Sequence, residues 1–453
     1  MKKHTQSPYE SSKVSYKPSG IEWLGEIPQS WEIKKCKFFF IIQNTIVGDL
    51  WNKTKLLSLT LNGVVERDIN NPEGKFPSDF STYQLVKRGN LVFCLFDVEE
   101  TPRAIGLSQI DGMITSVYTV IKVVNQNERF LAYLFISLDN GKNLSFLYRG
   151  LRKTISKEDL LNLKIPLPPL QEQKEIAEFL DSKCEKIQNY IDKKQKLITL
   201  LQEKKQALIN QAVTKGLNPN IESKNSGIEY LGEIPQHWEV RRVATLGKFF
   251  KGSNISKNDL QDSGVSVVLY GDIYTKYEIK TKQFQSKIAE NFAKDKTQIL
   301  CGDLLFSGSG ETKEDIGKCI CYLGNEKAYV GGDVIVLRQM GQDSLFLSYV
   351  LNSDYIKYQK AVISKGEIII HIYASNLRDL KIPLPPLHEQ KEIAEFLDSK
   401  VAQIDSVIEK TKKQIELIKE YKNTLINEAV CGRVACSRDF SPTAQNDKRA
   451  GLR

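Results

Sequence analysis

Two long stretches of the chain place apolar residues at heptad spacing and contain neither glycine nor proline. In the first, residues 170–213, apolar side chains recur in alternating steps of four and three if Lys194 and Lys205 fill two of the positions. Such a repeat lines up one seam along one face of a helix. A helix of this length would rise about 65 Å. The pattern therefore predicts a long helix with one buried seam.

The opening of this stretch occurs twice in the chain. KIPLPPLQEQKEIAEFLDSK at Lys164–Lys183 returns at Lys381–Lys400, where His388 stands in place of Gln171. Prolines stand just before each helix and are expected to end the preceding strand and fix the entry of the chain. A repeat this close indicates two tandem units of one design.

The seam keeps the same phase in both copies, although most outward-facing residues differ. We therefore expect the two helices to pack on each other through their seam residues. The predicted helix–helix core consists of Ile187, Ile191, Ile198, Leu201, Leu208, Ile404, Ile408, Ile415, Ile418 and Leu425. The outward faces, together with Glu172 and Glu389 at the helix openings, are then expected to be free to hold partner subunits.

Antiparallel packing is the more economical arrangement of the two helices. The chain must pass from the end of the first helix into the region before the second, and an antiparallel pair makes that path short. It also implies a pseudo-twofold axis. Lys205 and Lys422 fall in core phases of the seam, where a lysine can fix the register at a cost in stability. Equally, the aliphatic stems could be buried while the ammonium groups reach solvent.

A second repeat precedes each variable region. SGIEWLGEIPQSWE at Ser19–Glu32 returns as SGIEYLGEIPQHWE at Ser226–Glu239. We call these segments lead-in 1 and lead-in 2, and the variable regions that follow them, residues 33–163 and 240–380, head 1 and head 2. Each unit is thus a tryptophan-bearing lead-in, a head and a long helix.

The two heads share their ends more than their interiors. Gly89 and Gly302 each stand before an apolar run and predict a turn that enters a strand. Gly150 and Gly366 lie before matching approaches to the helices and are interpreted as backbone-geometry positions. Short apolar alternations predict further strands. The fold class is therefore mixed α/β (α+β): two similar domains joined by two long antiparallel helices in a coiled coil.

The repeats divide the chain into seven predicted segments. In chain order they are a disordered N-terminus (1–18), domain 1 with its lead-in (19–163), a central long helix (164–213), a linker (214–225), domain 2 with its lead-in (226–380), a C-terminal long helix (381–430) and a flexible tail (431–453).

Composition limits the classes of protein that the chain can be. A length of 453 residues suggests at least two domains, and no apolar run approaches the length of a membrane span. The polar N-terminus lacks a signal-peptide core, so a cytoplasmic location is expected. The eight cysteines form no CxxC pair and are interpreted as free thiols. A net charge of +9 permits nucleic acid as a partner without requiring it.

The pattern IPLPPLxEQxxIAxFLDxK before a long helix, present twice, with SGIExLGEIPxxWE before each head, resembles the specificity subunit of type I restriction–modification systems. The resemblance covers about residues 19–430. It implies two target-recognition domains that each read one half of a split, asymmetric DNA site. It also implies that the helices act as a spacer and dock two methyltransferase subunits, and that restriction (translocase/nuclease) subunits join this core.

On this resemblance the chain is non-catalytic and directs adenine methylation and DNA cleavage by its partners. It is expected to bind no cofactor or metal itself, whereas the partners are expected to use S-adenosylmethionine, ATP and Mg²⁺. The alternatives are a self-sufficient DNA nuclease or methyltransferase and a coiled-coil scaffold that binds protein. Purified protein with specific and scrambled DNA would separate them.

Catalytic motifs are absent from the sequence. It has no FxGxG adenosylmethionine loop, and Asn71-Pro72-Glu73-Gly74 lacks the second proline and aromatic of an adenine clamp. Gly317-Lys318-Cys319 lacks the hydroxyl of a phosphate-binding loop. Asp272 with Glu278 and Lys280 resembles a nuclease carboxylate pattern, but so short a pattern recurs by chance in a charged chain.

DNA contacts are expected on head loops, where side chains are free of packing. Arginine and asparagine can read base edges, while lysine mostly contacts phosphate. The candidates in head 1 are Arg88, Arg103, Ser116, Tyr118, Arg149, Arg152 and Lys153. The candidates in head 2 are Lys251, Ser253, Asn254, Tyr270, Tyr274, Lys276, Ser307, Ser309, Lys313 and Lys365. Each could instead be a solvated loop residue or, for the tyrosines, part of the core.

Overall fold

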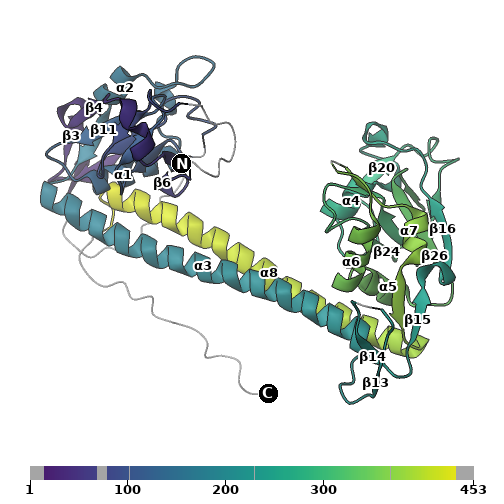
Figure 1. Ribbon diagram of the computed structural model, residues 1–453. Helices are drawn as coiled ribbons and strands as arrows, with labels where there is room; N and C mark the ends of the chain where they lie inside the picture. Colours follow the sequence, from purple (N-terminus) through teal and green to yellow (C-terminus); the bar gives the residue numbers. More distant parts are fainter. Residues whose placement is uncertain (1–14, 69–78, 102, 229, 368, 435–453) are drawn as a thin grey trace. The chain divides into compact units, whose positions relative to one another are not determined.

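The chain forms two compact units in the computed structural model (Figure 1). The residues that the structure describes are 15–68, 79–101, 103–228, 230–367 and 369–434. Unit 1 comprises residues 1–193 and 414–453, and unit 2 comprises residues 194–413. The long helices α3 (Leu170–Lys215) and α8 (Leu387–Val430) contribute to both units. Unit 1 contains the start of α3 and the end of α8, and unit 2 the reverse.

Unit 1 carries head 1 on an antiparallel sheet in the order β4-β11-β8-β9. Its elements are β1 (Tyr16–Pro18), β2 (Glu26–Pro28), β3 (Glu32–Lys35), β4 (Phe40–Gln43), β5 (Leu57–Thr60), β6 (Gly63–Glu66), β7 (Gln84–Val86), β8 (Leu91–Phe93), β9 (Ile105–Leu107), β10 (Gly112–Ile114), β11 (Thr119–Val123), α1 (Glu128–Asn140), α2 (Lys157–Asn162) and β12 (Lys164–Leu167). Hairpin β5–β6 and pair β7–β10 lie beside this sheet, and β3 pairs with β12.

Aromatic side chains hold α1 on the sheet of head 1. The Phe135 ring on α1 meets the Phe93 ring edge-on at 5.1 Å between centroids and the Phe40 ring at 5.7 Å. All three residues are buried. Burying side chains of this size supplies much of the free energy that orders a small head.

Unit 2 carries head 2 on two five-stranded sheets. Its strands are β13 (Ser223–Asn225), β14 (Glu233–Pro235), β15 (Glu239–Arg242), β16 (Gly247–Lys251), β17 (Leu260–Gln261), β18 (Val265–Val268), β19 (Lys280–Thr281), β20 (Ser286–Ile288), β21 (Gln298–Ile299), β22 (Leu304–Ser307), β23 (Ser309–Gly310), β24 (Cys319–Tyr322), β25 (Ala328–Val330), β26 (Val334–Gln339), β27 (Ile370–His371) and β28 (Lys381–Leu384). Its short helices are α4 (Tyr270–Thr275), α5 (Ser344–Leu351), α6 (Asp354–Ile363) and α7 (Ala374–Asp379).

The main sheet of head 2 repeats the order found in head 1. The order β16-β26-β22-β24 corresponds to β4-β11-β8-β9, with β19 added at the edge. The predicted turns agree in both heads, because Gly89 and Gly302 have φ of +87° and +91° just before β8 and β22. Only glycine adopts such a conformation without strain. One mixed α/β design is thus used twice.

The core of unit 2 is continuous from the head into the helix ends. Its buried apolar residues include Ile209 and Val213 of α3, Ile393 and Leu397 of α8, and Phe306 of β22. A shared core of this kind fixes the head to its helices by burial of apolar surface rather than by a linker.

Several predicted boundaries differ from the structure. The segments bounded as long helices at 164–213 and 381–430 open with strands β12 and β28 at residues 164–167 and 381–384. The helices begin at Leu170 and Leu387, after the prolines, as the sequence predicts. The paired prolines that follow each strand cannot donate a ladder hydrogen bond and separate it from the helix. Within the predicted disordered segment 1–18, residues 16–18 form β1, while residues 1–14 lie outside the described part of the chain.

Two further predicted boundaries differ from the structure, because residues assigned to a linker and to a tail belong to the folded units. The last three residues of the predicted linker 214–225 form β13, which pairs with β14 of lead-in 2. The predicted tail begins inside the fold, because Cys431 is buried and Arg433 donates a hydrogen bond to the Leu24 carbonyl at 3.0 Å. Residues 435–453 lie outside the described part.

The cysteines that the structure describes are all free thiols. Most are buried, and burial raises the pKa of the Cys319 thiol to about 12. Such a thiol stays protonated and unreactive at neutral pH. Among the described helices, none is long and apolar enough to cross a membrane.

Candidate functional site

A buried glutamine joins α3 to head 1. Gln173 Oε1 accepts a hydrogen bond from the Asn127 amide at 3.0 Å, and its Nε2 donates to the Pro168 carbonyl at 2.8 Å and to Gln126 Oε1 at 2.7 Å. Asn127 is itself the N-cap of α1 and accepts from the Phe130 amide. Gln173 therefore ties the proline turn, the start of α3 and the start of α1 together.

The repeat places the same set of glutamine hydrogen bonds in unit 2. Gln390 Oε1 accepts from the Asp343 amide at 3.0 Å, and its Nε2 donates to the Pro385 carbonyl and to Gln342 Oε1, both at 2.8 Å. Asp343 caps α5. Because Gln390 is 1% exposed and its amide is fully hydrogen-bonded to the proline turn and the start of α5, the glutamine of the repeated EQ pair has a structural role.

The tryptophan of each lead-in lies between the two long helices. Trp31 Nε1 donates to Glu172 Oε1 at 2.9 Å, and Trp238 Nε1 donates to Glu389 Oε1 at 3.1 Å. Both indole rings are completely buried. We call these two arrangements clasp 1 and clasp 2. They explain why the lead-in and the helix opening are repeated together.

The other end of each clasp is a glycine that terminates a helix. Gly216 follows α3 and Gly432 follows α8, each with φ of +71°. A Cβ on Gly216 would lie 3.3 Å from the Trp238 ring, and one on Gly432 would lie 3.1 Å from the Trp31 ring. Glycine is therefore needed both for the helix cap and for close approach of the indole.

The clasps correct one expectation about the helix openings. Glu172 and Glu389 were expected to be free for partner subunits. Each carboxylate instead accepts from its tryptophan, and Glu389 Oε2 also lies 2.8 Å from His237 Nε2. The pairing joins residues 141 and 151 positions apart in the chain, which sequence spacing does not reveal.

The predicted seam residues all lie on covered faces of the helices, in unit 1 and in unit 2. Ile187, Ile191, Ile198, Ile408, Ile415 and Leu425 are buried. Leu201, Leu208, Ile404 and Ile418 are half-buried. None of the ten projects fully into solvent, as a heptad seam requires.

Lys205, one of the two lysines in the seam, forms an ion pair with the other helix. Its Nζ lies 2.8 Å from an Asp405 oxygen and 3.9 Å from Glu278 of head 2. The side chain is only 17% exposed, so the stem packs while the ammonium group is neutralised. This geometry combines the two interpretations, because the lysine is tucked along the seam and also pairs in a defined register. Lys422 is half-buried.

The predicted DNA-contact residues of head 1 divide into exposed and packed side chains. Arg88, Ser116, Arg149, Arg152 and Lys153 are exposed. Arg103 instead donates to Asn140 Oδ1 at 2.8 Å. Tyr118 stacks on Phe96, and burial raises the pKa of its hydroxyl. Arg103 and Tyr118 thus stabilise their own head, which departs from the expectation of free loop residues.

The candidates of head 2 divide in the same way. Lys251, Asn254, Tyr270, Lys276, Lys313 and Lys365 are exposed, whereas Ser253 and Tyr274 are half-buried and Ser307 and Ser309 are buried. Ser253 Oγ binds Thr297, and Lys276 Nζ pairs with Asp272 at 2.8 Å. Ser307 and Ser309 were expected on a loop, but they continue into β22 and β23. Their role as surface contacts does not fit this structure, since β23 is covered by pairing with β27.

The residues of the nuclease-like pattern, Asp272, Glu278 and Lys280, do not form a common site. Asp272 is engaged by the Leu269 amide and by Lys276, and Lys280 pairs with Asp398. Across the described residues no group of three or more histidine, cysteine or acidic side chains could hold a metal ion. The residues of the near-match to an adenine clamp, Asn71-Pro72-Glu73-Gly74, lie outside the described part.

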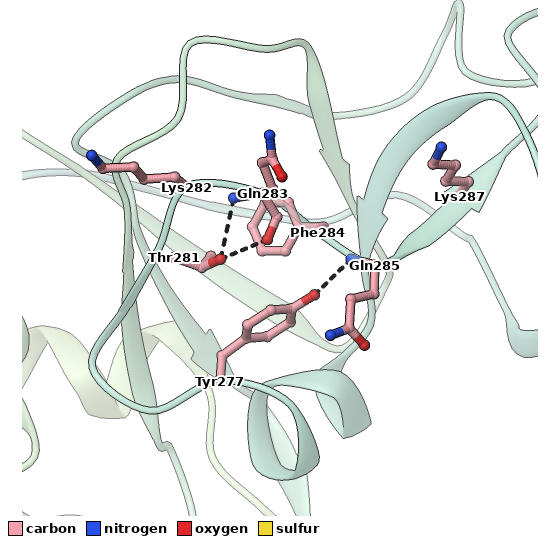
Figure 2. A pocket seen from close by; sticks show the side chains of 7 residues that line it. All are labelled: Tyr277, Thr281, Lys282, Gln283, Phe284, Gln285 and Lys287. Carbon is pink, nitrogen blue, oxygen red and sulfur yellow. Dashed lines mark hydrogen bonds between the residues drawn. The ribbon is translucent and has the colours of Figure 1, made fainter. Parts of the chain in front are cut away.

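A hollow beside Tyr277 in head 2 shows no convergent chemistry either (Figure 2). The Tyr277 hydroxyl accepts from the Gln285 amide at 2.8 Å. Lys282, Gln283 and Lys287 also line the hollow, but their side chains point in different directions rather than to a common centre. A catalytic site needs groups aimed at one reacting atom.

Comparison with known proteins decides which family this architecture represents. Residues 113–201 and 235–417 match the family model described as type I restriction modification DNA specificity domain. These segments cover more than half of the chain.

The chain is a type I restriction–modification specificity subunit.

Relatives support the assignment along most of the chain. The type I restriction enzyme MjaVIII specificity subunit of Methanocaldococcus jannaschii is 31% identical over 71% of this chain and 74% of its own. The EcoKI specificity subunit of Escherichia coli K12 is 26% identical over 47% of this chain and 46% of its own. A chain in a solved structure of the type I R-M system shares the fold with a TM-score of 0.66, at 16% identity over 90% of this chain and 99% of that one.

Membership settles the function at the level of the family. The specificity subunit recognises DNA sequence, is not itself a catalyst, and acts with methyltransferase and restriction subunits. The alternatives of a self-sufficient nuclease or methyltransferase and of a general scaffold are not favoured. Which loop residues contact DNA stays a prediction.

Three residues at or beside the matched hairpins are not among the candidates predicted from the sequence: Leu151, His371 and Tyr373. His371 is half-buried, and the other two are exposed. Leu151 is fully exposed at the tip of the hairpin that follows Arg149. In head 2, the His371 ring stacks near Tyr373, with 6.5 Å between centroids, and Tyr373 is 53% exposed. The matched Gly150 and Gly366 mark the two hairpins in the sequence, but nothing in the pattern distinguishes an exposed Leu151 from a core leucine.

Proposed function

We propose that each head of this specificity subunit reads one half of a bipartite, asymmetric DNA site, and that the chain directs adenine methylation and DNA cleavage by partner subunits. The observation that carries the proposal is the repetition of one scaffold with different exposed residues. Both heads have the same main strand order and the same glutamine link to a helix. Side chains at corresponding surface positions differ, so the two heads offer different chemistry to the bases.

The matched hairpins illustrate this difference. In head 1, Arg149 and Thr154 form a β-bridge that closes a hairpin of sequence RGLRKT. In head 2, Lys365 and His371 form a β-bridge that closes a hairpin of sequence KGEIIIH. The first is strongly cationic and the second is mixed and apolar. Equivalent places on two related scaffolds with unlike side chains suit an asymmetric target.

An exchange of heads tests the proposal. Residues 240–380 would be replaced by the corresponding head of another specificity subunit, leaving α3, α8 and head 1 intact. Methylation-sensitive sequencing of DNA from the host should show one half-site changed, with the other half-site and about the same gap retained. A change in both half-sites together would contradict the assignment of one half-site to each head.

The same proposal includes two methyltransferase subunits per chain. Each unit contains the start of one long helix and the end of the other, so the repeat offers two equivalent docking positions. Native mass spectrometry of the complex should give two methyltransferase subunits for each specificity subunit. A single methyltransferase subunit at saturating concentration would overturn this stoichiometry.

The cofactors belong to the partners under this proposal. S-adenosylmethionine would serve the methyltransferase subunits, and ATP with Mg²⁺ the restriction subunits. The described part of the specificity subunit offers no group of metal-binding side chains. A cytoplasmic location follows from the DNA target.

A further inference from the structure

The hairpin before the helix is built alike in the two heads. In head 1 the Arg149 amide donates to the Thr154 carbonyl at 2.9 Å and the Thr154 amide donates back at 3.0 Å. In head 2 the Lys365 and His371 amides exchange the same pair of bonds at 3.0 and 2.7 Å. We call the first of these, residues 149–154, the head 1 probe hairpin.

The tip of the probe hairpin is a single tight turn. The Lys153 amide donates to the Gly150 carbonyl at 3.2 Å, which leaves Leu151 and Arg152 at the two central positions. Leu151 is 102% exposed, more than any other large apolar side chain in the described part. Arg152 is exposed and forms no ion pair with the described residues. One apolar and one cationic side chain are thus presented together.

The turn is held rigidly by the neighbouring loop. The Asp97 amide donates to the Arg152 carbonyl at 2.8 Å, and the Ile155 amide donates to the Leu95 carbonyl at 2.8 Å. Asp97 and Lys153 both adopt a left-handed φ of +46°. Such a conformation is uncommon for residues other than glycine and persists only where the surroundings enforce it. The exposed tip is therefore a pre-organised feature of head 1.

The charge around the tip identifies its partner. Arg149, Arg152 and Lys153 lie within five residues, and no acidic residue interrupts the hairpin. Asp159 and Glu99 pair with Arg149 and Lys153 at 2.8 and 3.7 Å, while Arg152 remains available to a phosphate. A cationic segment with an apolar tip matches nucleic acid, because DNA-bending proteins insert leucine or isoleucine between base pairs while cations contact the backbone.

We propose that the probe hairpin inserts Leu151 between two base pairs in the half-site of head 1, with Arg152 on the adjacent phosphate. The inference rests on DNA recognition by head 1. Insertion unstacks one base step, and steps that unstack most easily, such as TA and CA/TG, are favoured there. Leu151 thereby contributes to sequence choice without a hydrogen bond to a base.

The experiment uses the complex of the specificity subunit with its methyltransferase subunits and duplexes that carry 2-aminopurine. The fluorescent base, an adenine analogue, replaces each adenine of either strand of the head 1 half-site in turn, and the target adenine is left unmodified. Binding should raise the fluorescence at one step. Leu151→Ser should abolish that rise and weaken specific binding by about tenfold or more, since an apolar side chain no longer leaves water. Leu151→Met should retain both.

A matched control removes another exposed leucine from the same head. Leu61 is 63% exposed in the β5–β6 hairpin, and Leu61→Ser should leave fluorescence and affinity unchanged. Unaltered fluorescence and affinity in Leu151→Ser would refute insertion. Restriction subunits are then added to the same complex. Unaltered DNA binding by Leu151→Ser with failure to bind the restriction subunits would also refute insertion and assign the tip to a protein contact. Neither result would affect the head exchange, which tests the assignment of half-sites separately.

Discussion

Replacing Trp238 by alanine should destabilise unit 2 by about 3–5 kcal/mol, the range for removing a fully buried tryptophan. The ring lies between the C-terminal glycine of α3 and the start of α8, and its Nε1 satisfies Glu389. The substitution therefore removes both the packing of clasp 2 and the partner of a carboxylate that is 15% exposed. Hydrogen–deuterium exchange of unit 2 peptides measures the loss as faster exchange in α5 and in the helix ends.

Two comparisons make the result specific to the clasp. Leu217→Ala changes an exposed residue next to Gly216 and should alter the unfolding free energy by less than about 0.5 kcal/mol. Trp31→Ala should produce a loss like that of Trp238→Ala, but in peptides of unit 1. Equal protection in the parent chain and in Trp238→Ala would show that the clasp does not stabilise the unit.

Gln390→Leu should destabilise unit 2 by about 3 kcal/mol even though leucine has a similar volume. The substitution leaves the Asp343 amide and the Pro385 carbonyl without the partners they have now, and each unsatisfied buried group costs about 1–3 kcal/mol. Because Asp343 caps α5, fraying should begin at the start of that helix. Urea denaturation followed by circular dichroism gives the magnitude, and hydrogen exchange locates the fraying.

An exposed glutamine on the same helix provides the control. Gln403 is exposed on α8, and Gln403→Leu should change the stability by less than about 0.5 kcal/mol. Equal losses of unfolding free energy in Gln390→Leu and Gln403→Leu would show that the buried hydrogen bonds of Gln390 do not stabilise the unit.

The helices and the doubled heads could be predicted from the sequence because their signals are local or repeated. Heptad spacing reports one buried face wherever it occurs, and its agreement in phase between two copies predicted the pairing of α3 with α8. The strand after Gly302 could be predicted for a similar reason, since a glycine before an apolar run is typical of a turn that enters a strand.

The details of the surface could not be predicted, since they depend on contacts between distant residues. Glu172 appears in the sequence as an exposed helix-opening carboxylate, and only the fold brings Trp31 to it. Ser309 looks like a loop residue in a run of glycine and serine, yet pairing of β23 with β27 buries it. Leu151 lies at an exposed tip, and nothing in the sequence distinguishes it from the leucines that form the core.

Unit 1 cannot complete its fold until the end of the chain has been translated, because it is built from both ends of the chain. Head 1 is translated long before the end of α8, yet Ser137 of α1 bonds to Asn427 of α8 across 290 residues of chain. Unit 2 is continuous in sequence and has all its parts once residue 413 has left the exit tunnel. Domains usually complete in the order in which they are translated. Here the second unit can finish first, and the nascent first unit must keep the apolar face of early α3 covered or chaperoned until the last helix is released.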